Sequence, residues 1–209
     1  EKVVRPYIIA EAGVNHEGDM DLAMRLIDEA REGGAHAIKF QTYRADTIAS
    51  RHSPAYWNID QEPTTSQYEM FQRYDKFWKP EFEELKIFCD KVGIEFLSTP
   101  FDCASAEFLN DLMNVFKISS SDITNKPFIE YICDFGKPVI LSTGASNILD
   151  FEDENLKILK ETDIIFDLSK EGLMHSKQTK EILSSGTRIM CISDEHPDIL
   201  VRLKPDVSL

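Results

Sequence analysis

Basic and hydroxyl side chains recur where short apolar runs of this sequence end, and together they could bind an anion. They are Lys39, Thr99, Lys117, Ser120 and Ser142. A lysine within an apolar run is costly to bury unless it meets an anion. Taken singly, each lysine is more often ion-paired or directs its amine to solvent. Taken as a group on one face, they favour a bowl that binds phosphate or carboxylate.

Two acidic residues stand at equivalent positions. Glu11 and Asp122 also follow apolar runs, where they could act as a base, accept a sugar hydroxyl or lie beside a metal. The alternative is that they form salt bridges with the same lysines. His16, shortly after Glu11, could bind substrate or act in acid-base chemistry, and a turn-capping role is equally open.

The elements that must position these residues alternate in type along the chain. Amphipathic stretches at 21–33 and 81–92 predict helices, and such alternation favours a parallel sheet. In a (β/α) barrel all strand carboxyl ends meet at one mouth, whereas an open doubly wound sheet spreads them along an edge. The strand-end groups therefore favour an α/β fold, either a TIM-type (β/α) barrel or a barrel-like parallel sheet. The predicted strands are 7–10, 37–40, 95–97, 115–118, 138–141, 164–166 and 188–192.

The connection between the second and third strands, residues 44–80, is unusually long. Connections of this length are often functional loops or lids, and a plain surface excursion is the alternative. Its aromatic residues, among them Tyr56, Trp57, Phe71 and Phe77, favour packing against the rest of the protein.

The overall composition narrows the classes of partner and compartment. A net charge of −14 and a pI near 4.8 argue against nucleic acid and against anionic membranes as the main partner, although a pocket can still be locally basic. Four widely spaced cysteines, no signal-peptide pattern and no long apolar run indicate a cytoplasmic protein. At 209 residues the chain is shorter than the roughly 250 of a typical complete barrel, and open edges would favour a homo-oligomer.

Five segments, in order, resemble the sialic-acid synthases and their legionaminate and pseudaminate relatives. The resemblance covers roughly residues 3–147. It implies a barrel enzyme that condenses phosphoenolpyruvate with an N-acyl sugar to form a sialic-acid-type nonulosonate. The segments are 7–18 (YIIAEAGVNHEG), 37–43 (AIKFQTY), 96–102 (FLSTPFD), 116–122 (FKISSSD) and 136–144 (GKPVILSTG).

The resemblance also implies roles for individual residues. Glu11 and Asp122 would lie near the reacting centre, and a divalent metal, manganese or magnesium, would activate the sugar aldehyde. Ser121 stands where the family often has glycine, which is a departure from its pattern. The residues that would hold phosphoenolpyruvate are Lys39, Thr99, Lys117, Ser120 and Ser142.

The resemblance ends after residue 147. Residues 155–206 are instead similar to the N-terminal domain of thermophile-type leucyl aminopeptidases, mainly through 163–176 and 186–192. We therefore expect a synthase-like portion, 1–147, and a flavodoxin-like βαβ segment, 148–209, that completes the sheet. An engineered chimera, a barrel scaffold without turnover, is the alternative to an enzyme. His175 and His196 are candidate metal ligands only, so the ligand set stays open.

Overall fold

The structure, a computed structural model, describes residues 7–142, 164–167 and 188–190. These residues fall into two compact units. The first unit is Tyr7–Met113, and the described part of the second begins at Asn114. Each unit is described by itself.

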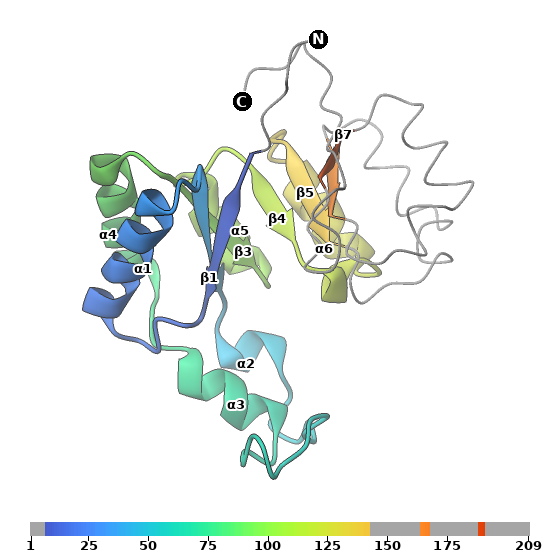
Figure 1. Cartoon of the computed structure of the whole chain (residues 1–209). Helices are drawn as coiled ribbons and strands as arrows, with labels where there is room; N and C mark the ends of the chain where they lie inside the picture. The colour runs from blue at the N-terminus through green and yellow to red at the C-terminus, as the bar shows by residue number, and fades with distance from the viewer. Residues whose placement is uncertain (1–6, 143–163, 168–187, 191–209) are drawn as a thin grey trace. The chain divides into compact units, whose positions relative to one another are not determined.

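The first unit is built on a parallel sheet of three strands in the order β1-β2-β3 (Figure 1). Helices alternate with the strands along the chain, so the predicted α/β pattern with parallel strands is confirmed here. Every strand begins within two residues of its predicted start. The elements are β1 (Ile9–Gly13), α1 (Met20–Glu32), β2 (Ala37–Thr42), α4 (Lys79–Val92), β3 (Glu95–Pro100) and α5 (Cys103–Asn110).

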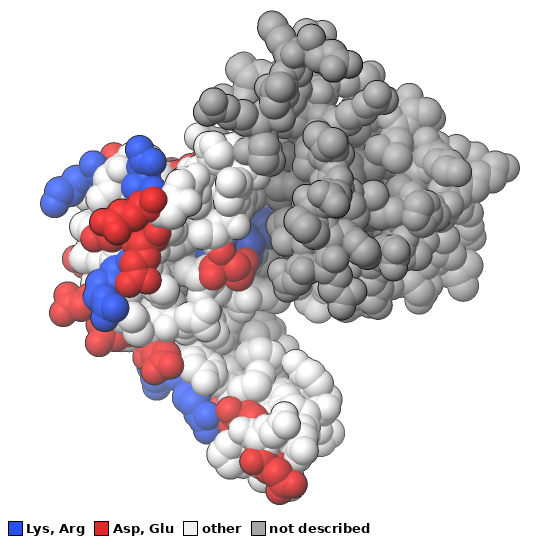
Figure 2. Space-filling model, viewed as in Figure 1, with Lys and Arg blue, Asp and Glu red and all other residues white. Residues whose placement is uncertain are grey.

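Local sequence explains where the helices of this unit begin and end. Asp19 caps α1 by accepting a hydrogen bond from the Leu22 amide at 3.0 Å. Helix α4 ends at Gly93, whose left-handed φ of 79° suits glycine. The outer faces of the helices carry interspersed charges of both signs (Figure 2), including the Lys86–Asp90 pair one turn apart on α4.

One face of the sheet packs against these helices. Ile38 and Phe40 of β2 are buried there, and Phe40 stacks on Phe96 of β3 with ring centroids 5.9 Å apart. Helix α4 contributes Phe82 and Leu85 to the same core. Apolar side chains at alternate strand positions therefore face the helices, and the side chains at the intervening positions point to the opposite face of the sheet.

The β2–α4 connection, residues 43–78, holds two short helices, α2 (Ala45–Ile48) and α3 (Gln67–Tyr74), and extends away from the sheet (Figure 1). Its two ends are tied together by Asp75, whose side chain is 8% exposed. One Asp75 oxygen accepts the Ala45 amide at 2.8 Å, and the other lies 2.9 Å from Nη1 of Arg44. This long segment is therefore closed at its root.

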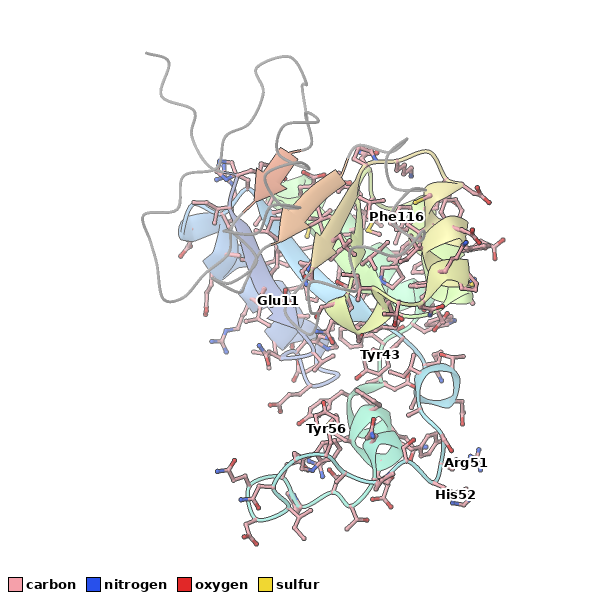
Figure 3. All side chains as sticks on the ribbon, turned by 90° about the vertical axis from the view of Figure 1, so that its right-hand side faces the viewer. Glu11, Tyr43, Arg51, His52, Tyr56 and Phe116 are labelled. Carbon is pink, nitrogen blue, oxygen red and sulfur yellow. The ribbon has the colours of Figure 1, made fainter. Side chains whose placement is uncertain are left out.

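We expect the aromatic residues of the connection to pack against the rest of the protein. This holds at the root of the connection, where it leaves the sheet, and fails for Tyr56. Phe77 is buried, and Phe71 meets Tyr43 edge to face at 5.6 Å. Trp57 donates its indole N–H to two backbone carbonyls of the connection itself. Tyr56, in contrast, is 77% exposed (Figure 3).

The second unit contains a parallel sheet of four strands in the order β4-β5-β6-β7. Strand β6 pairs with β5, and β7 pairs with β6, so the two later strands extend one sheet. The boundary expected near residue 147 lies outside the described residues. The elements are β4 (Phe116–Ile118), a 3-10 turn η1 (Ser120–Asp122), α6 (Lys126–Cys133), β5 (Val139–Ser142), β6 (Ile164–Asp167) and β7 (Arg188–Met190).

Two further observations bear on what the composition predicts about cysteines and membrane-spanning segments. Cys89 and Cys103 form no disulfide bond, and burial raises the pKa of the Cys89 thiol to about 12. Among the helices that the structure describes, none is long and apolar enough to cross a membrane.

His16 is a buried neutral histidine that joins the β1–α1 loop to the root of the connection. Its ring stacks on Phe77 with centroids 4.2 Å apart and faces Phe40 at 6.1 Å. Its Nδ1 accepts the Gly18 amide at 3.1 Å, which is the turn-capping role left open above. Burial lowers the pKa of His16 from 6.5 to about 4.

We therefore predict that His16 makes the protein acid-sensitive. Because its pKa is depressed in the folded state, the unfolded chain binds the extra proton between pH 6.5 and about 4. The free energy of unfolding should then decrease as the pH is lowered through that window, by up to about 1.4 kcal/mol per pH unit from this residue. Urea unfolding at several pH values measures the slope, and His16→Gln should flatten it. The exposed His52→Gln is the matched control, and a slope unchanged in His16→Gln contradicts the prediction.

Candidate functional site

The first unit brings one lysine, one carboxylate and one hydroxyl together on the face of the sheet away from the helices. In the parallel register Glu11 lies beside Lys39 on the neighbouring strand, and Gln41 lies beside Thr99. Lys39 and Gln41 are two residues apart on β2, so their side chains leave the same face. Figure 3 shows Glu11 on β1, which forms one side of this group.

Lys39 is the centre of this cluster. It is buried, with 8% of its surface exposed, and its ammonium forms an ion pair with Glu11. The same nitrogen donates to Oγ1 of Thr99 at 3.4 Å. The Glu11 side chain is 52% exposed, so the pair is open to solvent on the carboxylate side. The buried cation is thus accessible to an anion that competes with Glu11.

A bulge in β1 shapes the cluster. The β1–β2 register shifts between Glu11 and Gly13, and Gly13 has a left-handed φ of 55°. A Cβ on Gly13 would lie 3.3 Å from Oε1 of Glu11 and 3.7 Å from Nε2 of Gln41. Bulges often reorient a side chain beside a functional site. The glycine therefore leaves room for Glu11 and Gln41 at the strand end, a role that the sequence reasoning missed.

Thr42 and Ser98 form a second polar pair that the sequence reasoning did not single out. Their hydroxyls lie 2.7 Å apart, and both residues are fully buried. They occupy the alternate strand positions that face away from Lys39, so they belong to the helix-facing side. Their hydrogen bond satisfies two buried hydroxyls and ties β2 to β3.

The second unit holds a similar pair at its own strand ends. The ammonium of Lys117 on β4 donates to Oγ of Ser142, the last residue of β5. Ser119 follows β4, and Ser120 opens the turn η1. The structure therefore brings Lys117 and Ser142 together and places Ser120 in the turn after β4.

Asp122 ends the turn η1 as a half-buried carboxyl group. Burial raises its pKa, while hydrogen bonds from the side chains of Asn125 and Ser121 act in the opposite direction. The Asn125 amide is 3.2 Å from Oδ1, and the Ser121 hydroxyl is 3.5 Å from Oδ2. A carboxyl group placed this way can exchange a proton more readily at mild pH than an exposed aspartate.

A metal site is not formed within the described part of the chain. Across residues 7–142, 164–167 and 188–190, no group of three or more His, Cys, Asp and Glu side chains is placed to hold an ion. The candidate ligands His175 and His196 lie outside these residues, as do Thr143 and Gly144.

Comparison with known proteins gives a consistent result. The NeuB family model matches residues 26–179. The chain is 41% identical over 149 residues to the N,N'-diacetyllegionaminic acid synthase of Campylobacter jejuni, covering 70% of this chain and 44% of that protein. It is 32% identical over 143 residues to human N-acetylneuraminate-9-phosphate synthase, covering 68% of this chain and 40% of that protein.

A solved structure agrees over most of the chain. The sialic acid synthetase of Leptospira borgpetersenii aligns with a TM-score of 0.69 at 28% identity, covering 91% of this chain and 73% of that one. The chain spans about two fifths of the length of the curated relatives it matches, from 39 to 44% for the first three.

The bulge glycine provides a test of the cluster around Lys39. Gly13→Ala should destabilise the protein by about 1–2 kcal/mol because its φ is left-handed. It should also strengthen binding of inorganic phosphate severalfold, since the new Cβ lies 3.3 Å from Oε1 of Glu11 and crowds the carboxylate that competes with the anion for Lys39. Urea unfolding and calorimetry measure the two effects.

Gly34→Ala is the matched control for this substitution. Gly34 has a similar φ of 84°, but nothing lies within 4 Å of its added Cβ. It should lose comparable stability and keep its phosphate affinity. An equal change of phosphate affinity in both variants would show that Gly13 has no special role in the cluster.

Proposed function

The chain belongs to the NeuB family, and on that premise we propose that it carries the phosphoenolpyruvate-binding part of a synthase. The reaction condenses phosphoenolpyruvate with an N-acyl sugar to form a sialic-acid-type nonulosonate. The observation that carries the proposal is the buried ammonium of Lys39, held between Glu11 and Thr99 and open to solvent at the carboxylate.

Phosphoenolpyruvate is highly anionic, carrying a phosphate and a carboxylate. A buried ammonium binds such an anion more strongly than an exposed one, because water competes less for the charge. We propose that Lys39 and Thr99 bind this ligand and that Glu11 moves from the ammonium to the reacting centre when the anion arrives. The partial exposure of Glu11 supports such a movement.

We assign Lys117, Ser120 and Ser142 to the same ligand. The support comes from the strand-end motifs and from the hydrogen bond between Lys117 and Ser142, which supplies a cation and a hydroxyl at one point. Asp122 is assigned a proton-transfer role, which its raised pKa supports. In the reaction C3 of phosphoenolpyruvate attacks the sugar aldehyde, water adds at C2 and phosphate leaves. Fixed positive charge stabilises the charge that develops.

The divalent metal implied by the resemblance stays a proposal without assigned ligands. Residues 7–142, with the described strands β6 and β7, offer no group of three ligating side chains, so no step is derived through a metal. Its proposed contribution is to polarise the sugar aldehyde when bound.

The alternative, an engineered barrel scaffold without turnover, has less support. The NeuB match runs to residue 179 and so continues past the junction expected near residue 147. The junction and the aminopeptidase likeness remain predictions.

Calorimetry with phosphoenolpyruvate tests the binding half of the proposal. Lys39→Ala and Lys117→Ala should each weaken binding about tenfold or more, since each removes a charge-assisted hydrogen bond worth about 1.5–3 kcal/mol. Lys86→Ala is the charge-matched control, because this helix lysine is paired with Asp90. The proposal is wrong if the parent protein does not bind, or if all three variants lose affinity equally.

Phosphate release separates the synthase from an inert scaffold. The protein is incubated with phosphoenolpyruvate, Mn²⁺ and a panel of N-acyl hexosamines that begins with N-acetylmannosamine. We expect sugar-dependent release that falls to background in Lys39→Ala. Release that is no greater in the parent protein than in Lys39→Ala contradicts a synthase activity of this chain.

A further inference from the structure

Asn125 lies at the start of helix α6, but its side chain does not cap the helix as an asparagine at that position usually does. It is the N-cap residue of α6, a position where asparagine is among the preferred residues because its side-chain oxygen accepts a backbone N–H of the first turn. Here the side chain makes no such capping bond. Its amide nitrogen instead donates to Oδ1 of Asp122 at 3.2 Å.

The local backbone holds the two side chains in register. The backbone N–H of Asp122 donates to the Ser119 carbonyl at 3.0 Å. The backbone N–H of Asn125 donates to the Asp122 carbonyl at 2.8 Å. The Asn125 carbonyl in turn accepts the amides of Phe128 and Ile129, both of which are buried in the unit. The backbone of Asn125 is therefore held by the first turn of α6, while its side chain hydrogen-bonds to the preceding turn, η1.

The second oxygen of Asp122 has a weaker partner. The Ser121 hydroxyl lies 3.5 Å from Oδ2 and only 2.9 Å from the Ser119 hydroxyl. A serine hydroxyl has one proton to donate, and the shorter contact is to Ser119. Asn125 is consequently the main donor to the Asp122 carboxyl group among the described residues.

Charged groups around this turn are engaged elsewhere. Lys117 on β4 donates to Ser142, and Lys126 on α6 lies 3.9 Å from Glu130. Burial raises the pKa of Asp122, and the side-chain hydrogen bonds from Asn125 and Ser121 lower it. Among the described residues, the neutral hydrogen bond from Asn125 is thus the main attraction that stabilises the ionised carboxyl group against burial.

We propose that Asn125 is a positioning residue that orients the Asp122 carboxyl group and stabilises its ionised form. The inference rests on the proposed function only in giving Asp122 a proton to transfer. The side chain of Asn125 makes this contact in place of a capping bond to α6. Such an arrangement is expected where the ionisation of a particular carboxyl group matters more than local helix stability.

The variant Asn125→Ser separates positioning from helix stability. Serine is an equally good N-cap residue but is too short to reach Asp122, so α6 should be as stable or more stable. Loss of a neutral hydrogen bond to the carboxylate should raise the proton affinity of Asp122 about three- to tenfold. The neighbouring exposed Thr124→Ala is the matched control.

The measurement is the carboxyl titration of Asp122, followed by NMR in protein labelled with ¹³C-aspartate. Asp122→Asn identifies its resonance. The expected result is an upward shift of the Asp122 midpoint in Asn125→Ser and no shift in Thr124→Ala, with urea unfolding unchanged or improved. The inference is overturned if the midpoint stays the same in Asn125→Ser or moves equally in both variants.

This outcome is distinguishable from failure of the proposed function. The titration is read without substrate, whereas the proposed function is tested by phosphoenolpyruvate binding to the parent protein and to Lys39→Ala. A shifted titration without ligand binding would support the positioning role and remove the synthase role. Ligand binding without a shifted titration would do the reverse.

Discussion

The burial of one ammonium group constrains the first unit more than any other interaction. Lys39 is 8% exposed, and a cation at that depth requires both an opposite charge and a hydrogen-bond acceptor. Glu11 and Thr99 meet this need only if β1, β2 and β3 keep their observed register. A slip of one residue would turn Lys39 away from Glu11 and toward the helix-facing layer that holds Phe40 and Phe96.

The same register explains why the residues that stabilise the fold and the residues that could bind a ligand lie on opposite faces of the sheet. Apolar residues at alternate positions of β2 and β3 pack on the helices, and the positions between them carry Lys39, Gln41 and Thr99. The same alternation operates in the second unit, where Lys117 lies between the buried Phe116 and Ile118. A substitution on one face should therefore affect folding, and one on the other face should affect ligand binding.

The predicted elements were most accurate where a period in the sequence is long and regular. The α1 and α4 stretches bury residues at helical spacing, and their boundaries were right to within two residues. The β2–α4 connection was recognised only by its length. Its helix α2 spans four residues, too few to show a period, and its fold depends on Asp75 meeting Arg44 and Ala45 some 30 residues earlier.

By itself the sequence determined which residues stand at the ends of which strands, because the alternation of apolar and polar residues is local and the five motifs occur in order. It could not decide which partners those residues choose. Lys39 and Thr99 are 60 residues apart, so their contact depends on the sheet as a whole. Whether Asn125 caps its helix or turns back to Asp122 was equally undecided, since both uses suit the same residue at the same position. Each of the competing hydrogen bonds is worth only about 1 kcal/mol, so the folded structure around the turn selects between them.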